Sequence, residues 1–166
     1  YEGAIADYDK AIEFNPSFSE VYYNRGIAKR KSGDNEGAIA DYDKAIEFNP
    51  SFSEAYRNRG VAKKKLGDYA GAISDYSKAI EINPRYAGRY YNRGKAKQKL
   101  GNHRGAIKDY NMEIELNPKN FNAYQNLSIA KEQLGDLKGA CSDARKAVSL
   151  GSQDEGNKKW IRKKCA

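Results

Sequence analysis

Eighteen residues of this chain, GAIADYDKAIEFNPSFSE, occur at Gly3–Glu20 and again, without a substitution, at Gly37–Glu54. The two occurrences lie 34 residues apart, and the same interval can be followed, with substitutions, along the rest of the chain. It divides the sequence into a half copy (1–18), four full copies (19–52, 53–86, 87–120 and 121–154) and a short tail (155–166). A fixed period of this length is typical of chains that stack one small unit along an axis. We therefore expect one repeat domain, taken from a longer protein.

Each full copy contains the residues of two short helices separated by a turn. The turn is a glycine followed by Asp or Asn, as at Gly33 and Asp34. Glycine suits a left-handed C-terminal cap, and the side chain after it can cap the next helix. The second helix should end before an Asn-Pro pair, as at Pro50, because proline disfavours helical backbone in the residue before it. Each helix has room for about three to four turns, too few to be stable alone in water, so stacking must stabilise it.

Small residues recur at fixed positions of both helices and indicate where the helices touch. They are Gly26, Gly60 and Gly94 in the first helix, and Ala38, Ala72, Ala106 and Ala140 in the second. Small side chains at helical spacing allow two helix axes to approach closely. We expect the tyrosines beside them to fill the core rather than to bind a cofactor. Glu113 replaces a small alanine in the third full copy and Ser128 replaces the glycine in the fourth, so we expect looser packing around Glu113.

This pattern resembles the tetratricopeptide repeat family, whose spacing is Trp-x2-Leu-Gly-x2-Tyr, then Ala-x3-Phe, an Ala and a Pro. In the first full copy these positions hold Tyr22, Arg25, Gly26, Lys29, Ala38, Tyr42, Ala45 and Pro50. The resemblance covers nearly the whole chain. It implies an all-α fold, a right-handed superhelical solenoid of antiparallel helix pairs. Two positions depart from the family: Arg replaces Leu in three copies, and Lys replaces the inner Tyr in all four.

The arginine substitution predicts its own partner. Asp41, Asp75 and Asp109 follow Arg25, Arg59 and Arg93, respectively, at a constant interval of sixteen residues, in the helix that packs back on the first. A half-buried guanidinium without a carboxylate would be costly, so we expect an Arg–Asp pair within each of these copies. The fourth copy has Leu127 instead of arginine, so Asp143 must find another partner.

The first helices of a stack of helix pairs line its concave surface, which is the usual binding surface of such proteins. Side chains at i, i+3, i+4 and i+7 of each first helix should face this groove. The predicted peptide-binding groove consists of Tyr23, Asn24, Ile27, Arg30, Lys31, Arg57, Asn58, Val61, Lys64, Lys65, Tyr91, Asn92, Lys95, Gln98, Lys99 and Asn126.

Two features of this groove predict its ligand. One asparagine per copy (Asn24, Asn58, Asn92 and Asn126) forms a row, and an amide can bond to the backbone of an extended peptide of any sequence. Each such bond contributes about 1 kcal/mol. The groove is also rich in Lys and Arg, in a chain of net charge +8, so we expect a protein or peptide partner with an acidic segment. The alternatives are that the amides bond to neighbouring helices and that the lysines only promote solubility.

Two other functions stay open. Nucleic acid or another polyanion could bind along the same groove, although Tyr23 and Tyr91 are its only aromatic residues and no nucleic-acid motif is present. The chain could also be a self-association or spacer module, because Ala4, Tyr8 and Ala11 lack the first helix that would cover them. The family's clamp for chaperone tails needs Lys and Asn where this chain has Tyr23 and Ile27, which disfavours that ligand.

No residue pattern indicates catalysis, a cofactor or a metal site. His103 is the only histidine and falls in a turn, with no nucleophile placed near it. Cys141 and Cys165 form no disulfide framework, so we expect a buried Cys141, an exposed Cys165 and a cytoplasmic, reducing compartment. No apolar run is long enough to span a membrane. The tail should form a capping helix whose Trp160 covers the last copy.

Overall fold

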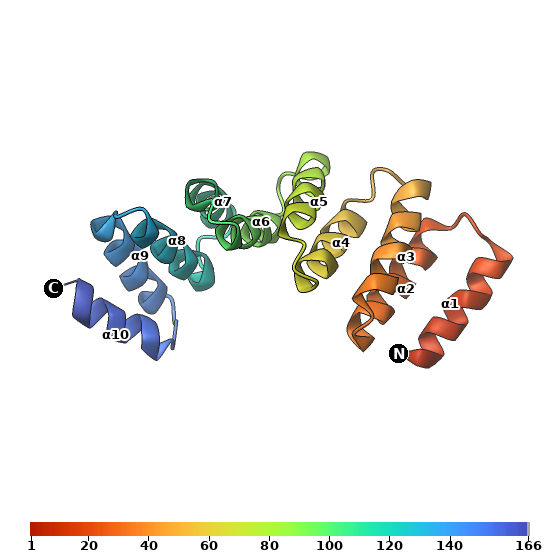
Figure 1. The fold of residues 1–166 in the computed structure, drawn as a ribbon, viewed down its shortest axis with the longest axis horizontal. Coiled ribbons are helices and arrows are strands. Elements are labelled where there is room, and N and C mark those ends of the chain that lie inside the picture. Colours follow the sequence, from red (N-terminus) through yellow and green to blue (C-terminus); the bar gives the residue numbers. More distant parts are fainter. Residues whose placement is uncertain (166) are drawn as a thin grey trace. The chain divides into compact units, whose positions relative to one another are not determined.

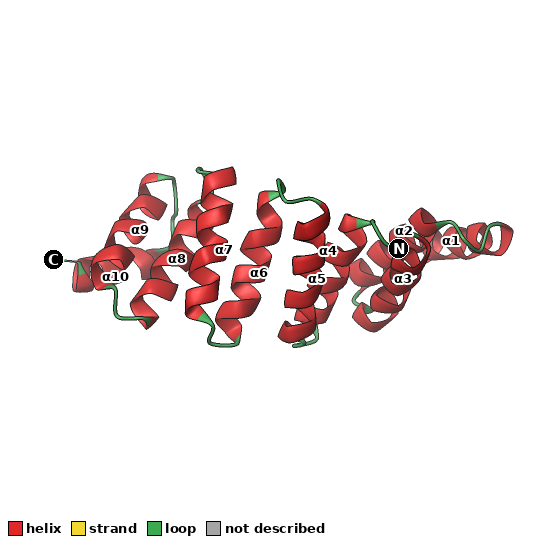
Figure 2. Ribbon diagram, turned by 90° about the horizontal axis from the view of Figure 1, so that it is seen from above, coloured by secondary structure: helices red, strands yellow, loops and turns green. Residues whose placement is uncertain are grey.

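The computed structural model describes residues 1–165, and helices joined by short loops form this part of the chain (Figure 1 and Figure 2). It divides into two compact units, of which the first spans Tyr1–Pro84 and the second begins at Arg85. The helices of the first unit are α1 (Glu2–Phe14), α2 (Ser19–Ser32), α3 (Asn35–Phe48), α4 (Ser53–Lys65) and α5 (Tyr69–Ile82). Those of the second are α6 (Ala87–Lys99), α7 (His103–Leu116), α8 (Phe121–Gln133), α9 (Leu137–Ser149) and α10 (Glu155–Lys164). Residues 1–165 contain no strand, and the predicted all-α repeat fold is confirmed.

Within each unit, every helix packs against the next one along the chain. The first helices of neighbouring copies also contact each other: α2 touches α4 in the first unit, and α6 touches α8 in the second. These first helices carry all the residues of the predicted groove.

The predicted turn chemistry is present in every full copy. Gly33, Gly67, Gly101 and Gly135 all have a positive φ, from 75° to 98°, a conformation that glycine adopts at little cost. The residue after each glycine caps the next helix. The Asp34 carboxylate, for example, accepts a 2.7 Å hydrogen bond from the backbone N–H of Gly37. These local signals explain why the helix boundaries could be placed from the sequence.

The small glycines of the first helices are required by the tyrosines of the second. A Cβ atom on Gly26 would lie 2.7 Å from Cε1 of Tyr42, and one on Gly60 would lie 2.9 Å from Cε1 of Tyr76. Both tyrosines are fully buried. The tyrosines at this position are therefore core residues, as predicted. In the last full copy the equivalent positions hold Ser128 in α8 and Ala144 in α9, and both residues are buried.

The predicted Arg–Asp pairs form in all three copies. Arg25 Nη2 lies 2.6 Å from Asp41 Oδ1, and Arg59 and Arg93 hold Asp75 and Asp109 at 2.6 and 2.7 Å. The lysine that replaces the inner tyrosine of the family joins the same carboxylate in each copy: the Lys29, Lys63 and Lys97 ammonium groups lie 2.8–2.9 Å from these aspartates. The arginine and the lysine that depart from the family pattern therefore share one buried aspartate in each of these three copies.

The remaining charge substitutions also find partners within their unit. Asp143, which has no arginine opposite it, pairs with Lys131 at 2.7 Å. Glu113 is 1% exposed and accepts a 2.7 Å hydrogen bond from the Asn120 amide, while its Oε2 is buried without a hydrogen-bond partner. A cavity of about 430 Å³ adjoins Glu113, where the sequence predicts loose packing.

The expectation of two unpaired cysteines is wrong. Cys141 in α9 and Cys165, directly after α10, form a disulfide with Cα atoms 5.6 Å apart, and Cys165 is half-buried rather than exposed. The reason is the course of the tail: α10 folds back along α9, so its C-terminal end meets the start of α9. Trp160 of α10 is half-buried and donates a 2.8 Å hydrogen bond to Glu132 of α8.

Candidate functional site: the inner faces of the first helices

In the first unit, the inner face is organised around Tyr23 of α2. Its ring packs on Phe52 (centroids 4.7 Å apart), and its hydroxyl accepts a 2.9 Å hydrogen bond from the Asn58 amide of α4. Arg57 donates to the Asn58 side-chain oxygen at 3.2 Å. Burial, and next the charge of nearby Glu54, raise the pKa of Tyr23 above its ordinary value, so its hydroxyl stays protonated at neutral pH.

The second unit repeats this arrangement between the third and fourth full copies. The Asn126 amide of α8 donates to the Tyr91 hydroxyl of α6 at 3.1 Å and also to the Asn122 backbone oxygen at 2.8 Å. The Lys95 ammonium lies 5.5 Å from the centre of the Tyr91 ring. Burial raises the pKa of Tyr91, as it does that of Tyr23. Each unit therefore has one asparagine that links two first helices through a tyrosine.

The asparagine row is not uniform. Asn24 is exposed, Asn92 is half-buried and donates 2.7 Å to the Gly88 oxygen, and Asn126 is half-buried. Asn58 is only 5% exposed, and both ends of its amide are used inside the protein. In the first unit, Asn24 thus presents the more accessible amide. The Asn–Tyr links were not predicted, because they join residues 35 positions apart and depend on which copies carry tyrosine at the groove.

The cations of the first helices fall into two classes. Those that face the second helices (Arg25, Lys29, Arg59, Lys63, Arg93, Lys97 and Lys131) each pair with a buried or half-buried aspartate. In contrast, no carboxylate of residues 1–165 forms an ion pair with six cations of the predicted groove: Arg30, Lys31, Arg57, Lys65, Lys95 and Lys99. The Nε atoms of Arg30 and Arg57 are buried and have no hydrogen-bond partner among the described residues. The inner faces therefore carry positive charge that no carboxylate of the described residues neutralises.

A cavity of about 360 Å³ adjoins the inner face of the second unit, and we call it the lysine pocket. Four predicted groove residues line it: Lys95, Gln98, Lys99 and Asn126. His103, Ile129 and Gln133 complete the lining. His103 belongs to the first turn of α7 rather than to the loop, is half-buried, and its Nδ1 is buried without a hydrogen-bond partner. Its role in the pocket was missed because the helix spacing of the groove does not extend to the second helices.

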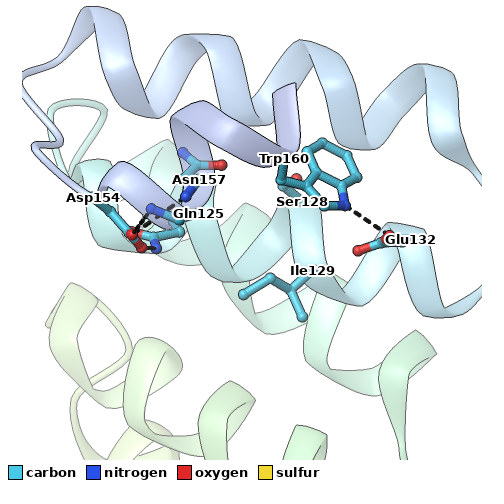
Figure 3. Close-up of a pocket in the computed structure, with 8 residues that line it drawn as sticks. Gln125, Ser128, Ile129, Glu132, Asp154, Asn157 and Trp160 are labelled. Carbon is cyan, nitrogen blue, oxygen red and sulfur yellow. Dashed lines mark hydrogen bonds between the residues drawn. The ribbon is translucent and has the colours of Figure 1, made fainter. Parts of the chain in front are cut away.

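A second cavity, of about 230 Å³, lies between α8 and α10, and we call it the tryptophan pocket. Figure 3 shows Asp154 beside Gln125 at one side, Trp160 beside Glu132 at the other, and Ile129 between them. Gln125 donates to Asp154, whose other oxygen caps α10 by accepting from the Gly156 and Asn157 N–H groups at 2.9 and 3.3 Å. Ile129 lines both pockets, which are therefore neighbours.

Across residues 1–165, no group of three or more His, Cys, Asp or Glu side chains is arranged to hold a metal ion. The same residues include no helix with the length and apolar character needed to cross a membrane.

A stack of antiparallel helix pairs, with polar inner faces on the first helices, defines the chain as a repeat solenoid. The family model of the TPR repeat matches residues 1–32, 28–67 and 62–101, and that of the tetratricopeptide repeat matches residues 87–120 and 121–153. The chain belongs to the tetratricopeptide repeat family, whose members are generally non-catalytic scaffolds for protein interactions.

Solved structures of this family superpose closely on the chain. The crystal structure of MamA is 28% identical, with a TM-score of 0.88, covering 95% of this chain and 91% of that one. The first TPR of Spaghetti (RPAP3), bound to an HSP90 peptide, is 32% identical, with a TM-score of 0.69, covering 70% of this chain and 93% of that one. YrrB, described as a TPR protein with an unusual peptide-binding site, shares the fold at 21% identity and a TM-score of 0.86, covering 98% of this chain and 83% of that one. No curated protein matches the chain significantly.

Proposed function

We propose that this protein is a non-catalytic scaffold that binds an extended, acidic peptide segment on the inner faces of its first helices. The observation that carries the proposal is the division of the cations. Within residues 1–165, aspartates neutralise the arginines and lysines toward the second helices, whereas Arg30, Arg57, Lys95 and Lys99 form no ion pair with a carboxylate. Cations without counter-charges attract anionic ligands and guide their approach.

The amides have a supporting role in the proposal. Asn24 is exposed and free to bond to a peptide backbone, while Asn58 and Asn126 hold the tyrosines of the neighbouring first helix in place. A relative with 32% identity binds a peptide, which supports a peptide as the ligand class here. Lys95 and Lys99, at the lysine pocket, are the residues we expect to contact an acidic side chain.

The test is fluorescence anisotropy with two labelled decapeptides, one alternating Ser and Glu and one alternating Ser and Gln. The Lys95→Gln/Lys99→Gln variant should bind the acidic peptide about tenfold more weakly, because each lost contact contributes about 0.7 kcal/mol. The matched control is Lys44→Gln/Lys78→Gln, which removes the same charge from exposed lysines of α3 and α5 that pair with Glu47 and Glu81. An equal loss in both variants, or equal binding of the two peptides by the native protein, would refute the proposal.

Nucleic-acid binding along the same faces gives a different result in this assay. A labelled ten-nucleotide single strand would then bind more tightly than the acidic peptide, with an affinity that falls steeply as salt is raised.

Self-association is favoured by a separate observation. Helix α1 has no buried residue: Ala4 is exposed, and Tyr8 and Ala11 are only half-buried. We propose this face as a contact between copies. Sedimentation velocity over a hundredfold concentration range should show a mass increase that Tyr8→Glu abolishes. A monomer at every concentration would exclude this role.

A further inference from the structure

The tryptophan pocket combines an apolar surface with negative charge at both ends. Ile129, 40% exposed, and the half-buried ring of Trp160 provide the apolar part, and Glu132 and Asp154 provide the charges. A long cationic side chain has the complementary character, because its methylene stem packs on apolar surface while its charged head stays polar. An aromatic ring adds attraction for a cation.

The two carboxylates are oriented but not neutralised. Glu132 accepts from the Trp160 indole, and Asp154 accepts from Gln125 and from the N–H groups at the start of α10. These donors are neutral, and no Lys or Arg of the described residues forms an ion pair with either carboxylate. Two fixed carboxylates without a paired cation therefore lie at one cavity.

Ser128 supplies a third, independent observation. It is 4% exposed, lines the pocket, and replaces the glycine that the other full copies have at this position. Figure 3 shows Ser128, a residue of α8, beside the Trp160 ring. A hydroxyl at the wall of the pocket can accept a hydrogen bond from an ammonium or guanidinium group.

We propose that the tryptophan pocket binds a lysine or arginine side chain of the partner peptide. The inference rests on the proposed function and deepens it. Ile129 lines both this pocket and the lysine pocket. These neighbouring sites of opposite charge would select a segment with an acidic and a basic residue, rather than a uniformly acidic one. Helix α10, held to α9 by the disulfide, then completes a binding site in addition to covering the last copy.

The chain has a single tryptophan, so the Trp160 indole N–H signal in a nitrogen–proton correlation spectrum reports on this pocket alone. The probes are N-acetyl-arginine amide and N-acetyl-citrulline amide, which differ in the charge of the head group, titrated at constant ionic strength. We expect the arginine probe to shift the signal saturably and the citrulline probe to bind at least about threefold more weakly. Equal dissociation constants for the two probes, or no saturable shift, would overturn the proposal without any variant being needed.

Two variants test the assigned carboxylates. Glu132→Gln keeps an acceptor for the Trp160 indole, and Asp154→Asn keeps a residue type suited to the helix cap. Each should weaken the arginine probe about two- to fivefold, as expected for one partly exposed ion pair. Glu36→Gln, on the exposed first turn of α3, removes the same charge and should have no effect. If the native protein bound the Ser-Glu decapeptide but not the arginine probe, this inference alone would be refuted. If it bound the arginine probe but not the decapeptide, only the proposed function would be refuted.

Discussion

The charge cluster around Asp75 gives a quantitative prediction for the stability of the repeat. Asp75 is 3% exposed and accepts from Arg59 Nε at 3.0 Å and Nη2 at 2.6 Å, while the Lys63 ammonium lies at 2.9 Å. Asp75→Asn would remove the charge and turn an amide N–H toward two cations. Breaking a buried ion pair typically costs 3–5 kcal/mol, and because the two cations keep some solvent exposure we expect about 3 kcal/mol.

Other copies contain an equivalent of the Asp75 cluster, at Asp41, and a weaker ion pair, at Asp143. Asp41 pairs with the equivalent residues Arg25 and Lys29 at the same distances, so Asp41→Asn should also cost about 3 kcal/mol. Asp143 has only Lys131, at 2.7 Å, and its side chain is 13% exposed, so Asp143→Asn should cost about 1 kcal/mol or less. Asp43→Asn is the matched surface control, because this 54%-exposed carboxylate makes one contact with Arg59 and should cost less than about 1 kcal/mol.

The measurement is urea unfolding followed by far-ultraviolet circular dichroism, with the free energy of unfolding extrapolated to water. The Arg59→Leu/Asp75→Ala double variant, which restores an apolar pair, should be more stable than Asp75→Asn alone, since replacing both members of a buried pair is nearly neutral. The reasoning would be refuted if Asp75→Asn cost no more than Asp43→Asn. It would equally be refuted if Asp143→Asn cost as much as Asp75→Asn.

Three further predictions concern single sites. Burial raises the pKa of Asp143 above its ordinary value despite the opposing effect of Lys131, and a raised folded-state pKa contributes stability that is lost as the pH rises through it. The stability of the native protein relative to Asp143→Asn should therefore fall from about pH 4 upward, and a constant difference would contradict this. Gly60→Ala should destabilise the protein by about 1–2 kcal/mol, because the added Cβ would clash with Tyr76. Gly3→Ala, with no atom near its Cβ, should stabilise the protein by up to about 1 kcal/mol. Urea unfolding should distinguish the two variants. Cys165→Ser should lower the stability of the last copy by about 3 kcal/mol, given the 24-residue separation, and an unchanged tryptophan-fluorescence transition would count against it.

The sequence was most informative where a contact lies within one copy. The Gly33 turn, the Gly26–Tyr42 approach and the Arg25–Asp41 pair all recur at a fixed interval, and the helix geometry of one copy is enough to place them. The participation of Lys29 was missed, although the same interval carries it: the lysine follows the arginine by one helical turn in every copy that has one.

The sequence was least informative where contacts join different copies or involve the tail. The bond between Asn58 and Tyr23 depends on side-chain torsions of two separate helices, which no spacing specifies. The disulfide at Cys165 depends on the direction in which α10 leaves the last copy, and the period has ended by then. The tryptophan pocket requires both the tail and the replacement of glycine by Ser128, so a search for repeated features passes over it.

Arg25 and Arg59 each hold two aspartates, one in the second helix of their own copy and one in the second helix before it: Arg25 bonds to Asp9 as well as Asp41, and Arg59 to Asp43 as well as Asp75. The ion pairs on the two sides of α3 are thus the same, with equivalent donor and acceptor atoms in both places. If a gene lost or gained 34 codons at this point, each arginine of the shortened or lengthened protein would still have an aspartate in the helix on either side of it. No charged residue at the new junction would lack its ion-pair partner. Unequal recombination between the duplicated segments would therefore yield proteins of different length that can still fold, and array length becomes a property that evolution, or an engineer, can change in whole steps.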